Sequence, residues 1–232
     1  MVKRSPRWLM IAGSLVAMLL YGCVPRPVAK QDQIILPDMG RESIAVMPFL
    51  KGMYDSRLDE AIDRTLDCAL AELCFDTRDV ASGAEKNLTR YMQAALEERL
   101  GERMIPLGKT LKAYEGLAKN QTTDSPRSLA VMLGRELKAD HVVVGTVWRY
   151  RERTGTPRAS SSPASVAFVV YIINSADGKR LWKKPYFETQ KPLSENIFEV
   201  RTFFKRGVRW LSVDELARYG VQEIVDQFPY AI

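Results

Sequence analysis

The 232-residue chain has few histidines and cysteines, the side chains that many catalytic and metal sites use. It also lacks the short glycine-containing motifs of common enzymes. It contains one histidine and three cysteines and no Cys-x-x-Cys pair, so a zinc site is not expected. The Gly-x-Ser-x-Gly signature of serine hydrolases is missing, as are the glycine-rich phosphate loops GxGxxG and GxxxxGK[ST]. We therefore expect no metal, no cofactor and no enzymatic activity. A hydrolase with an unrecognised site stays as an alternative.

Long hydrophobic runs are also scarce, because only the N-terminus carries one. Lys3, Arg4 and Arg7 precede an uncharged, mostly apolar stretch from Trp8 to Leu20. A membrane-spanning helix needs about 20 apolar residues, so this stretch is too short for one. It matches instead the apolar region of a signal peptide, which has roughly 7–15 residues after a basic start.

The residues that end this stretch, Leu20-Tyr21-Gly22-Cys23, resemble the lipobox of bacterial lipoproteins. The resemblance implies that residues 1–22 are removed and that Cys23 is acylated on its thiol and on its new amine. Two or more acyl chains anchor a protein stably to a membrane. Cys23 is followed by Val24 and not by Asp, which in enterobacterial lipoproteins favours the outer membrane, facing the periplasm. The alternative is an uncleaved anchor helix.

The mature chain carries nearly equal numbers of basic and acidic residues. The whole sequence has 34 basic and 28 acidic residues, and residues 1–22 hold three basic residues and no acidic one. The mature charge is therefore only about +3, which does not favour a nucleic-acid partner. With 46% apolar and 27% charged residues, the composition is that of a globular protein.

The mature chain reads as an extended tether over residues 23–41 and a single domain over 42–232. Apolar runs predict strands and helical spacing predicts helices. The order of these elements predicts an α/β domain, a mixed β-sheet flanked by helices, with strand 139–149 at its centre. The predicted strands are 42–50, 103–107, 139–149, 166–173 and 180–189, the predicted helices are 83–100, 110–118, 125–138, 193–204 and 212–225, and 151–163 is predicted to be a loop.

Two stretches of this domain resemble a group of envelope lipoproteins. The first stretch runs from Ala130 to Val147 and reads as a helix followed by a buried strand with a Gly-Thr step. The second is the opening strand from Ile44 to Phe49. The group includes the curli-secretion channel lipoprotein, the lipoprotein activators of penicillin-binding proteins and the N-terminal domain of the Tol periplasmic protein. The resemblance implies a fold and a habit of binding envelope proteins.

The membrane-channel function of one group member is kept only as an alternative. A membrane β-strand should alternate apolar and polar residues. The run 166–173 is apolar throughout, and its partner 180–189 is polar and contains Pro185. We therefore predict an accessory or regulatory factor of an envelope machine that acts by protein contact. A subunit of an oligomeric secretion or assembly channel, hence a homo-oligomer, is the alternative.

Two thiols are left after lipidation, Cys68 and Cys74. The periplasm is oxidising, and paired thiols there usually form a disulfide. Residues six apart on a helix lie roughly 240° apart around its axis, so a bond requires a bend between them. We predict a Cys68–Cys74 disulfide; the alternative is a helix over 57–74 with two thiols.

The remaining candidate residues are a histidine and a group of arginines. His141 follows Asp140 in a strand, where neighbours point to opposite faces, so we expect a structural histidine. A deep pocket that holds either residue with a second titratable group would favour the hydrolase. The candidates for a binding loop, for an acidic partner, a lipid headgroup or a glycan phosphate, are Arg149, Arg151, Arg153 and Arg158. The alternative is an exposed strand end. Aromatic residues are frequent late in the chain, and one or two on the surface would mark a partner face.

Overall fold

The computed structural model describes residues 42–52, 65–71, 79–120, 122–156, 160–190 and 209–229. The signal peptide, the tether, Cys23, Cys74, Arg158 and the predicted helix 193–204 lie outside the described residues. Within the described residues, no helix is both long and apolar enough to cross a membrane.

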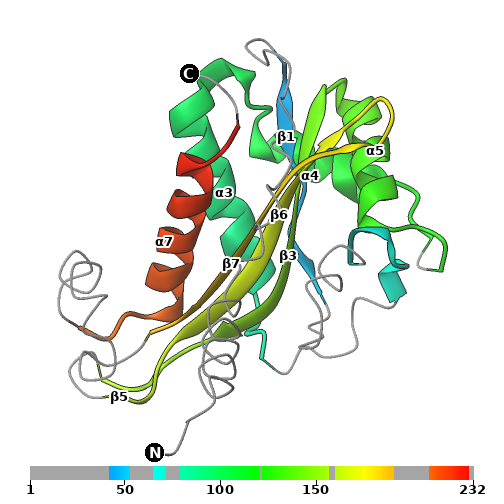
Figure 1. Cartoon of the computed structure of the whole chain (residues 1–232). Coiled ribbons are helices and arrows are strands. Elements are labelled where there is room, and N and C mark those ends of the chain that lie inside the picture. Colours follow the sequence, from blue (N-terminus) through cyan, green and yellow to red (C-terminus); the bar gives the residue numbers. More distant parts are fainter. Residues whose placement is uncertain are drawn as a thin grey trace, which may run out of the picture. The chain divides into compact units, whose positions relative to one another are not determined.

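A five-stranded mixed sheet forms the centre of the domain (Figure 1). Its order is β1-β3-β6-β7, and β2 also pairs with β3. β1 and β2 run parallel to β3, whereas β3, β6 and β7 are antiparallel neighbours. This confirms the α/β class and the central place of the strand that follows Ala139. The strands are β1 (Ile44–Val46), β2 (Leu50–Lys51), β3 (His141–Arg151), β6 (Ser165–Asn174) and β7 (Arg180–Thr189).

Helices cover both faces of the sheet. α3 (Ala84–Leu100) and α7 (Val213–Asp226) pack on one face, which we call the α3/α7 face. α4 (Leu107–Gly116) and α5 (Pro126–Leu137) pack on the other, the α4/α5 face. Figure 1 shows the two pairs on opposite sides of the strands.

Local sequence signals determine where two of these helices begin. Ser125 caps α5 with Pro126 at its first position, and the Ser125 side chain accepts from the Ser128 backbone. Ser212 and Glu215 form a capping box at the start of α7. Both caps satisfy backbone N–H groups that have no partner within the helix.

Three predicted elements differ from the structure by more than their end residues. The strand 42–50 is split into β1 and β2 around Pro48, which cannot donate a backbone hydrogen bond. The strand 103–107 is reduced to a single bridge between Met104 and Ile44, because residues 101–103 form a 3₁₀ turn. The loop 151–163 contains a two-stranded ribbon, β4 (Thr154–Gly155) and β5 (Ser160–Ser162).

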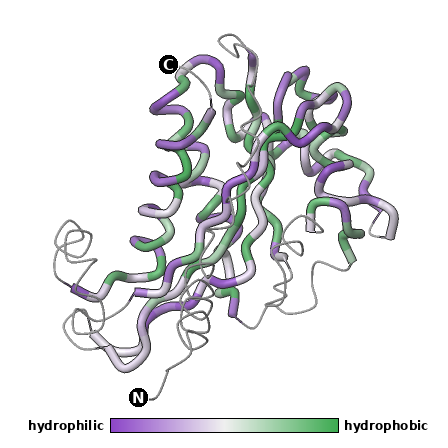
Figure 2. Tube along the Cα trace, viewed as in Figure 1, coloured by the Kyte–Doolittle hydropathy of each residue, from purple (hydrophilic) through white to green (hydrophobic). Residues whose placement is uncertain are grey.

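The core lies on both sides of β3 and β6, whose apolar residues Figure 2 shows along the middle of the sheet. Val143 and Val147 face α3 and α7, while Val142 and Val144 face α5. Gly145 lies under the ring of Phe49, so that a Cβ at Gly145 would come within 2.3 Å of ring carbons. The strand and the ring can pack this closely because residue 145 has no side chain.

Candidate functional site

A β-bulge near the end of β3 decides where its arginines point. Val147 lies opposite Phe168 on β6, and Arg149 lies opposite the next β6 residue, Ala167. Trp148 is therefore an extra residue in the ladder. Directly paired residues on neighbouring strands share a face of the sheet. Ala167 and Trp148 both belong to the core of the α4/α5 face, so Arg149 lies on that face too.

Without this bulge, the arginines of β3 would lie on the opposite face. A regular strand would place Arg149 and Arg151 on the same side as Val147, toward α3 and α7. In the structure Arg151 pairs with Ser165 and follows Arg149 on the α4/α5 face. Arg151 is exposed and Arg149 is half-buried.

Strand β7 adds an exposed aromatic ring beside these arginines. Phe187 lies opposite Ala167 and is 45% exposed. The ring of Trp148 reaches across the small Ala167 side chain, and its centroid lies 5.4 Å from that of Phe187. Trp148 itself is only 4% exposed, so it forms the floor on which Phe187 packs. Phe187 is thus a surface aromatic of the kind expected at a partner face.

The charges on this face of β3, β6 and β7 are of one sign. β6 carries no charged residue. On β7 the pairing places Lys184 and Glu188 on the opposite face, against Val170 and Val166. The charged residues on the α4/α5 face of the three strands are therefore Arg149, Arg151, Arg180 and Lys183. We call Trp148, Arg149, Arg151, Lys183 and Phe187 the basic aromatic face.

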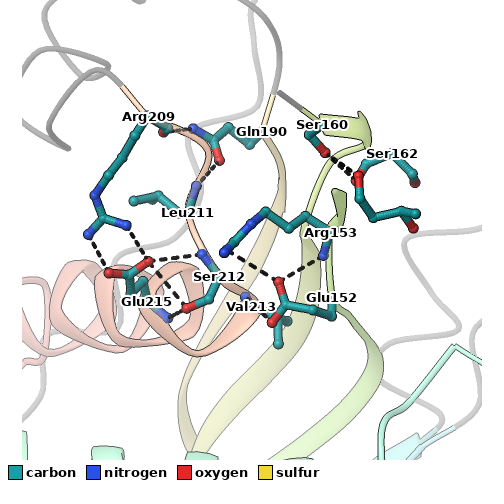
Figure 3. A network of polar contacts seen from close by, with 11 residues as sticks. Glu152, Arg153, Ser160, Ser162, Gln190, Arg209, Leu211, Ser212, Val213 and Glu215 are labelled. Carbon is teal, nitrogen blue, oxygen red and sulfur yellow. Dashed lines mark hydrogen bonds and ion pairs between the residues drawn. The ribbon is translucent and has the colours of Figure 1, made fainter. Parts of the chain in front are cut away.

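Arg153 is held elsewhere, at the start of α7. Its guanidinium forms an ion pair of 3.5 Å with Glu152, whose other carboxylate oxygen accepts from the Val213 backbone N–H (Figure 3). The structure therefore brings two of the four predicted arginines together, Arg149 and Arg151, and separates Arg153 from them. Arg158 lies outside the described residues.

A dense polar network fastens the N-terminus of α7 around this pair (Figure 3). Gln190 donates to the Arg209 carbonyl and accepts from the Leu211 backbone N–H. Arg209 binds both carboxylate oxygens of Glu215, one at 3.0 Å. This guanidinium is the main reason why the pKa of Glu215 falls to about 2. The network joins Gln190, which follows β7, to the start of α7, so Arg209 has a structural role.

The residues Asp140 and His141 lie in a cleft of about 490 Å³ at the opposite end of β3, which Glu42 and Ser175 also line. The Asp140 carboxylate accepts from the Ser43 backbone N–H at 2.8 Å and from the Ser43 hydroxyl at 2.9 Å. The first of these bonds is the largest cause that lowers the pKa of Asp140. Burial lowers the pKa of His141.

The cleft holds both residues beside a second titratable group, Glu42, but its histidine and its hydroxyl do not form a nucleophile–base pair. The hydroxyl among its lining residues belongs to Ser175, which packs under Gly134 of α5. His141 pairs with Ile44, whose side chain lies in the core of the α3/α7 face. The imidazole and this hydroxyl therefore point to opposite faces of the sheet, so His141 cannot activate Ser175 as a base must.

One cysteine of the predicted disulfide is described. Cys68 is half-buried, and its thiol donates to the Thr65 carbonyl at 3.5 Å. The helical residues 65–67 end at Cys68, which lies in a bend. This is the departure from a helix that a bond to Cys74 requires. Cys74 lies outside the described residues, so the bond stays a prediction.

No family model matches this chain, and no curated protein matches it. Its fold is similar to several solved structures at low identity. PelC from Paraburkholderia phytofirmans, a dodecamer, is 11% identical with a TM-score of 0.46, covering 83% of this chain and 91% of PelC. The lipoprotein GNA1162 from Neisseria meningitidis is 17% identical with a TM-score of 0.38, covering 72% and 94%. The LpoB C-terminal domain from Salmonella enterica is 13% identical with a TM-score of 0.36, covering 65% and 84%. The likeness is limited to a general fold group.

Proposed function

We propose that this protein is an outer-membrane lipoprotein, anchored through acylated Cys23 and facing the periplasm. Its domain acts by protein contact as an accessory or regulatory factor of an envelope machine, such as peptidoglycan synthesis or secretion. The N-terminal sequence supports the anchor: a basic start, a short apolar stretch and a lipobox precede the cysteine.

The observation that carries the contact function is the basic aromatic face. Protein interfaces are enriched in aromatic residues and arginine, and these residues supply most hot spots of binding energy. Phe187 is large, apolar and 45% exposed, and Arg151 is exposed two strands away on the same face. Both side chains project from hydrogen-bonded strands rather than from loops, and such positions hold a binding surface in a fixed geometry.

The basic aromatic face lies at the end of β3 that is distant from Glu42. The described chain enters the sheet at Glu42, beside His141 at the start of β3. The arginines lie at the other end of β3, about 30 Å away at the usual rise per residue.

Two experiments test the proposal separately. For the anchor, cells expressing the wild type or Cys23→Ala are labelled with palmitate and fractionated. We expect label and outer-membrane recovery only with Cys23; a membrane-bound, unlabelled wild type would refute acylation. For the contact, intact cells are crosslinked, and the proteins captured with the lipoprotein are identified by mass spectrometry.

The outcome of the crosslinking distinguishes the contact function from its rival. Recovery of a peptidoglycan synthase or a secretion component supports an accessory factor. A ladder of defined multiples of the protein itself, with no other partner, supports the oligomeric channel or assembly instead. Recovery of the monomer alone at every crosslinker concentration would refute both.

A further inference from the structure

We propose that the cleft at the start of β3 binds a small zwitterion, a molecule that carries an ammonium and a carboxylate group. Free amino acids have this chemistry, and so do the amino-acid end groups of peptide chains. The site is separate from the basic aromatic face, which lies at the other end of β3.

Both signs of charge line the cleft. Arg135 and Lys138 come from the end of α5, whereas Glu42 and Asp140 come from the residues that lead into β1 and β3. A ligand of one charge sign would meet two like charges here, which costs affinity, and a zwitterion pairs with both signs. The volume of about 490 Å³ lies within the usual range for small-molecule sites, roughly 300–1,000 Å³.

Hydrogen-bond donors at the end of α5 and in the turn after β6 define the carboxylate end of the site. The Arg135 guanidinium donates one bond to the Ala176 carbonyl, at 3.3 Å, and has further N–H groups to offer. The Oδ1 of Asn174 accepts from the Ala176 backbone, which leaves the amide N–H groups of Asn174 as donors. Within the described residues, the Lys138 ammonium forms no hydrogen bond or ion pair.

The backbone of Lys138 supports a role for its side chain. Lys138 caps the C-terminus of α5 with a φ of 55°, and it is the one non-glycine residue with positive φ in the described ranges. Glycine is the usual residue at this helix position, because a side chain is strained there. Strained residues of this kind gather at ligand sites. Lysine at position 138 places an ammonium at the cleft, where glycine would place none.

Two buried polar atoms of the cleft also need a partner. Ser175 Oγ and Glu42 Oε2 are buried and form no hydrogen bond within the described structure. Ser175 is 5% exposed, and its hydroxyl lies against Gly134, which has no side chain to fill the space. Buried polar groups are normally hydrogen-bonded. The hydroxyl can donate to a ligand carboxylate, and the Glu42 oxygen can accept from a ligand ammonium.

Phosphate and a metal ion fit the cleft less well. The carboxylates of Glu42 and Asp140 would repel a phosphate, whose charge is negative throughout. Among the described residues, no group of three or more His, Cys, Asp and Glu side chains could hold a metal ion. The Asp140 carboxylate already accepts two bonds from Ser43, so Glu42 is the acceptor that remains for an ammonium.

The test measures the affinity of the full-length, lipidated protein in detergent by isothermal titration calorimetry. The probes are L- and D-alanine, propionate, which lacks the ammonium, ethylamine, which lacks the carboxylate, and inorganic phosphate. We expect alanine to bind at least about tenfold more tightly than each single-charge analogue, since each analogue loses one hydrogen bond to a charged group. If propionate, ethylamine or phosphate binds as tightly as alanine, the proposal is overturned.

A soluble peptidoglycan fragment that ends in diaminopimelate distinguishes the two sources of the same chemistry. This end group carries an ammonium and a carboxylate on one carbon. Tighter binding of the fragment than of alanine assigns the cleft to the cell wall, and binding of alanine without the fragment assigns it to free amino acids. Binding of neither would overturn the proposal.

Variants of the cleft test its two ends separately. Lys138→Gly suits the backbone conformation at this position, so its melting temperature should not fall, while its affinity for the bound probe should fall about tenfold. Glu42→Gln should lower the affinity by a similar factor at the ammonium end. The matched control is Lys112→Ala, which removes an exposed charge from α4 outside the cleft. An unchanged affinity in either cleft variant, or an equal loss in the control, would refute the assignment.

Discussion

A buried tyrosine holds α7 to the sheet, and removing its hydroxyl should produce a measurable, pH-dependent loss of stability. Tyr150 is 2% exposed at the end of β3, on the α3/α7 face. Its hydroxyl donates to Asp214 at the start of α7, and the same carboxylate oxygen accepts from the Asn87 side chain of α3 at 3.1 Å. One carboxylate thus joins β3, α3 and α7.

The magnitude follows from this arrangement. Tyr150→Phe keeps the buried ring and removes one hydrogen bond to a charged group, which costs about 1.5–3 kcal/mol. For a domain of this size each kcal/mol lowers Tm by about 2–4 °C, so at neutral pH a loss near 2 kcal/mol lowers it by about 4–8 °C. The matched control, Tyr219→Phe, changes an exposed tyrosine and should shift stability by less than about 0.5 kcal/mol.

The pH dependence has a definite sign. Burial, followed by the hydrogen bond to Asp214, raises the pKa of Tyr150 in the folded protein. Its stabilising effect is therefore complete below the unfolded tyrosine pKa of about 10 and is lost as the pH rises above it, by about 1.4 kcal/mol per pH unit. The wild type's advantage of about 2 kcal/mol over Tyr150→Phe should vanish near pH 11.5.

Urea or thermal unfolding, followed by circular dichroism from pH 7 to about 11.5, measures both effects. The reasoning is refuted if Tyr150→Phe is as stable as the wild type at pH 7. It is also refuted if the difference between the two proteins stays constant above pH 10, because then the tyrosine would not gain its stability from a protonated hydroxyl.

Three further predictions concern other parts of the fold. Gly145→Ala places a Cβ against the ring above it and should cost about 1–3 kcal/mol in chemical unfolding; an unchanged midpoint would contradict the close packing. Glu215→Gln weakens the contact with Arg209 and should cost about 0.5–1 kcal/mol at pH 7, since the carboxylate is about one-third exposed and water screens it. Because the pKa of Glu215 is lowered to about 2, this stability is present above its unfolded pKa and lost as the pH falls from about 4.5 to 2; an acid unfolding curve identical in shape to that of the wild type would contradict it. Mass spectrometry after alkylation without reductant should find Cys68 and Cys74 unlabelled in the periplasmic protein, and labelling of both thiols would refute the disulfide.

Elements whose signal is local could be predicted from the sequence. The caps at Ser125 and Ser212 depend on hydroxyl and carboxylate groups within three residues of the helix start. The two long apolar runs became β3 and β6 because a strand buried on both faces needs apolar side chains at every position. The predicted strand 103–107 was wrong because its weak apolar pattern competed with a 3₁₀ turn that begins at Gly101.

The candidate contact face could be predicted only in part. The density of arginines after Val147 and of aromatic residues after Arg180 is visible in the sequence. The sequence does not show that these residues lie on one face of the sheet. Their placement depends on which β6 residue pairs with each β3 residue and on a bulge that shifts this register by one. A one-residue shift in a strand moves every later side chain to the other face.

The sequence by itself therefore determined the features that neighbouring residues encode: the lipobox prediction at Cys23, the helix caps, the buried strands and the α/β class. Tertiary structure alone decided that Arg149 and Arg151 join Phe187 on one face, that Arg153 joins the start of α7, and that His141 and Ser175 point to opposite faces. The reason is physical. Caps and apolar runs depend on contacts within a few residues, whereas these groupings depend on the register between strands that are distant in the chain.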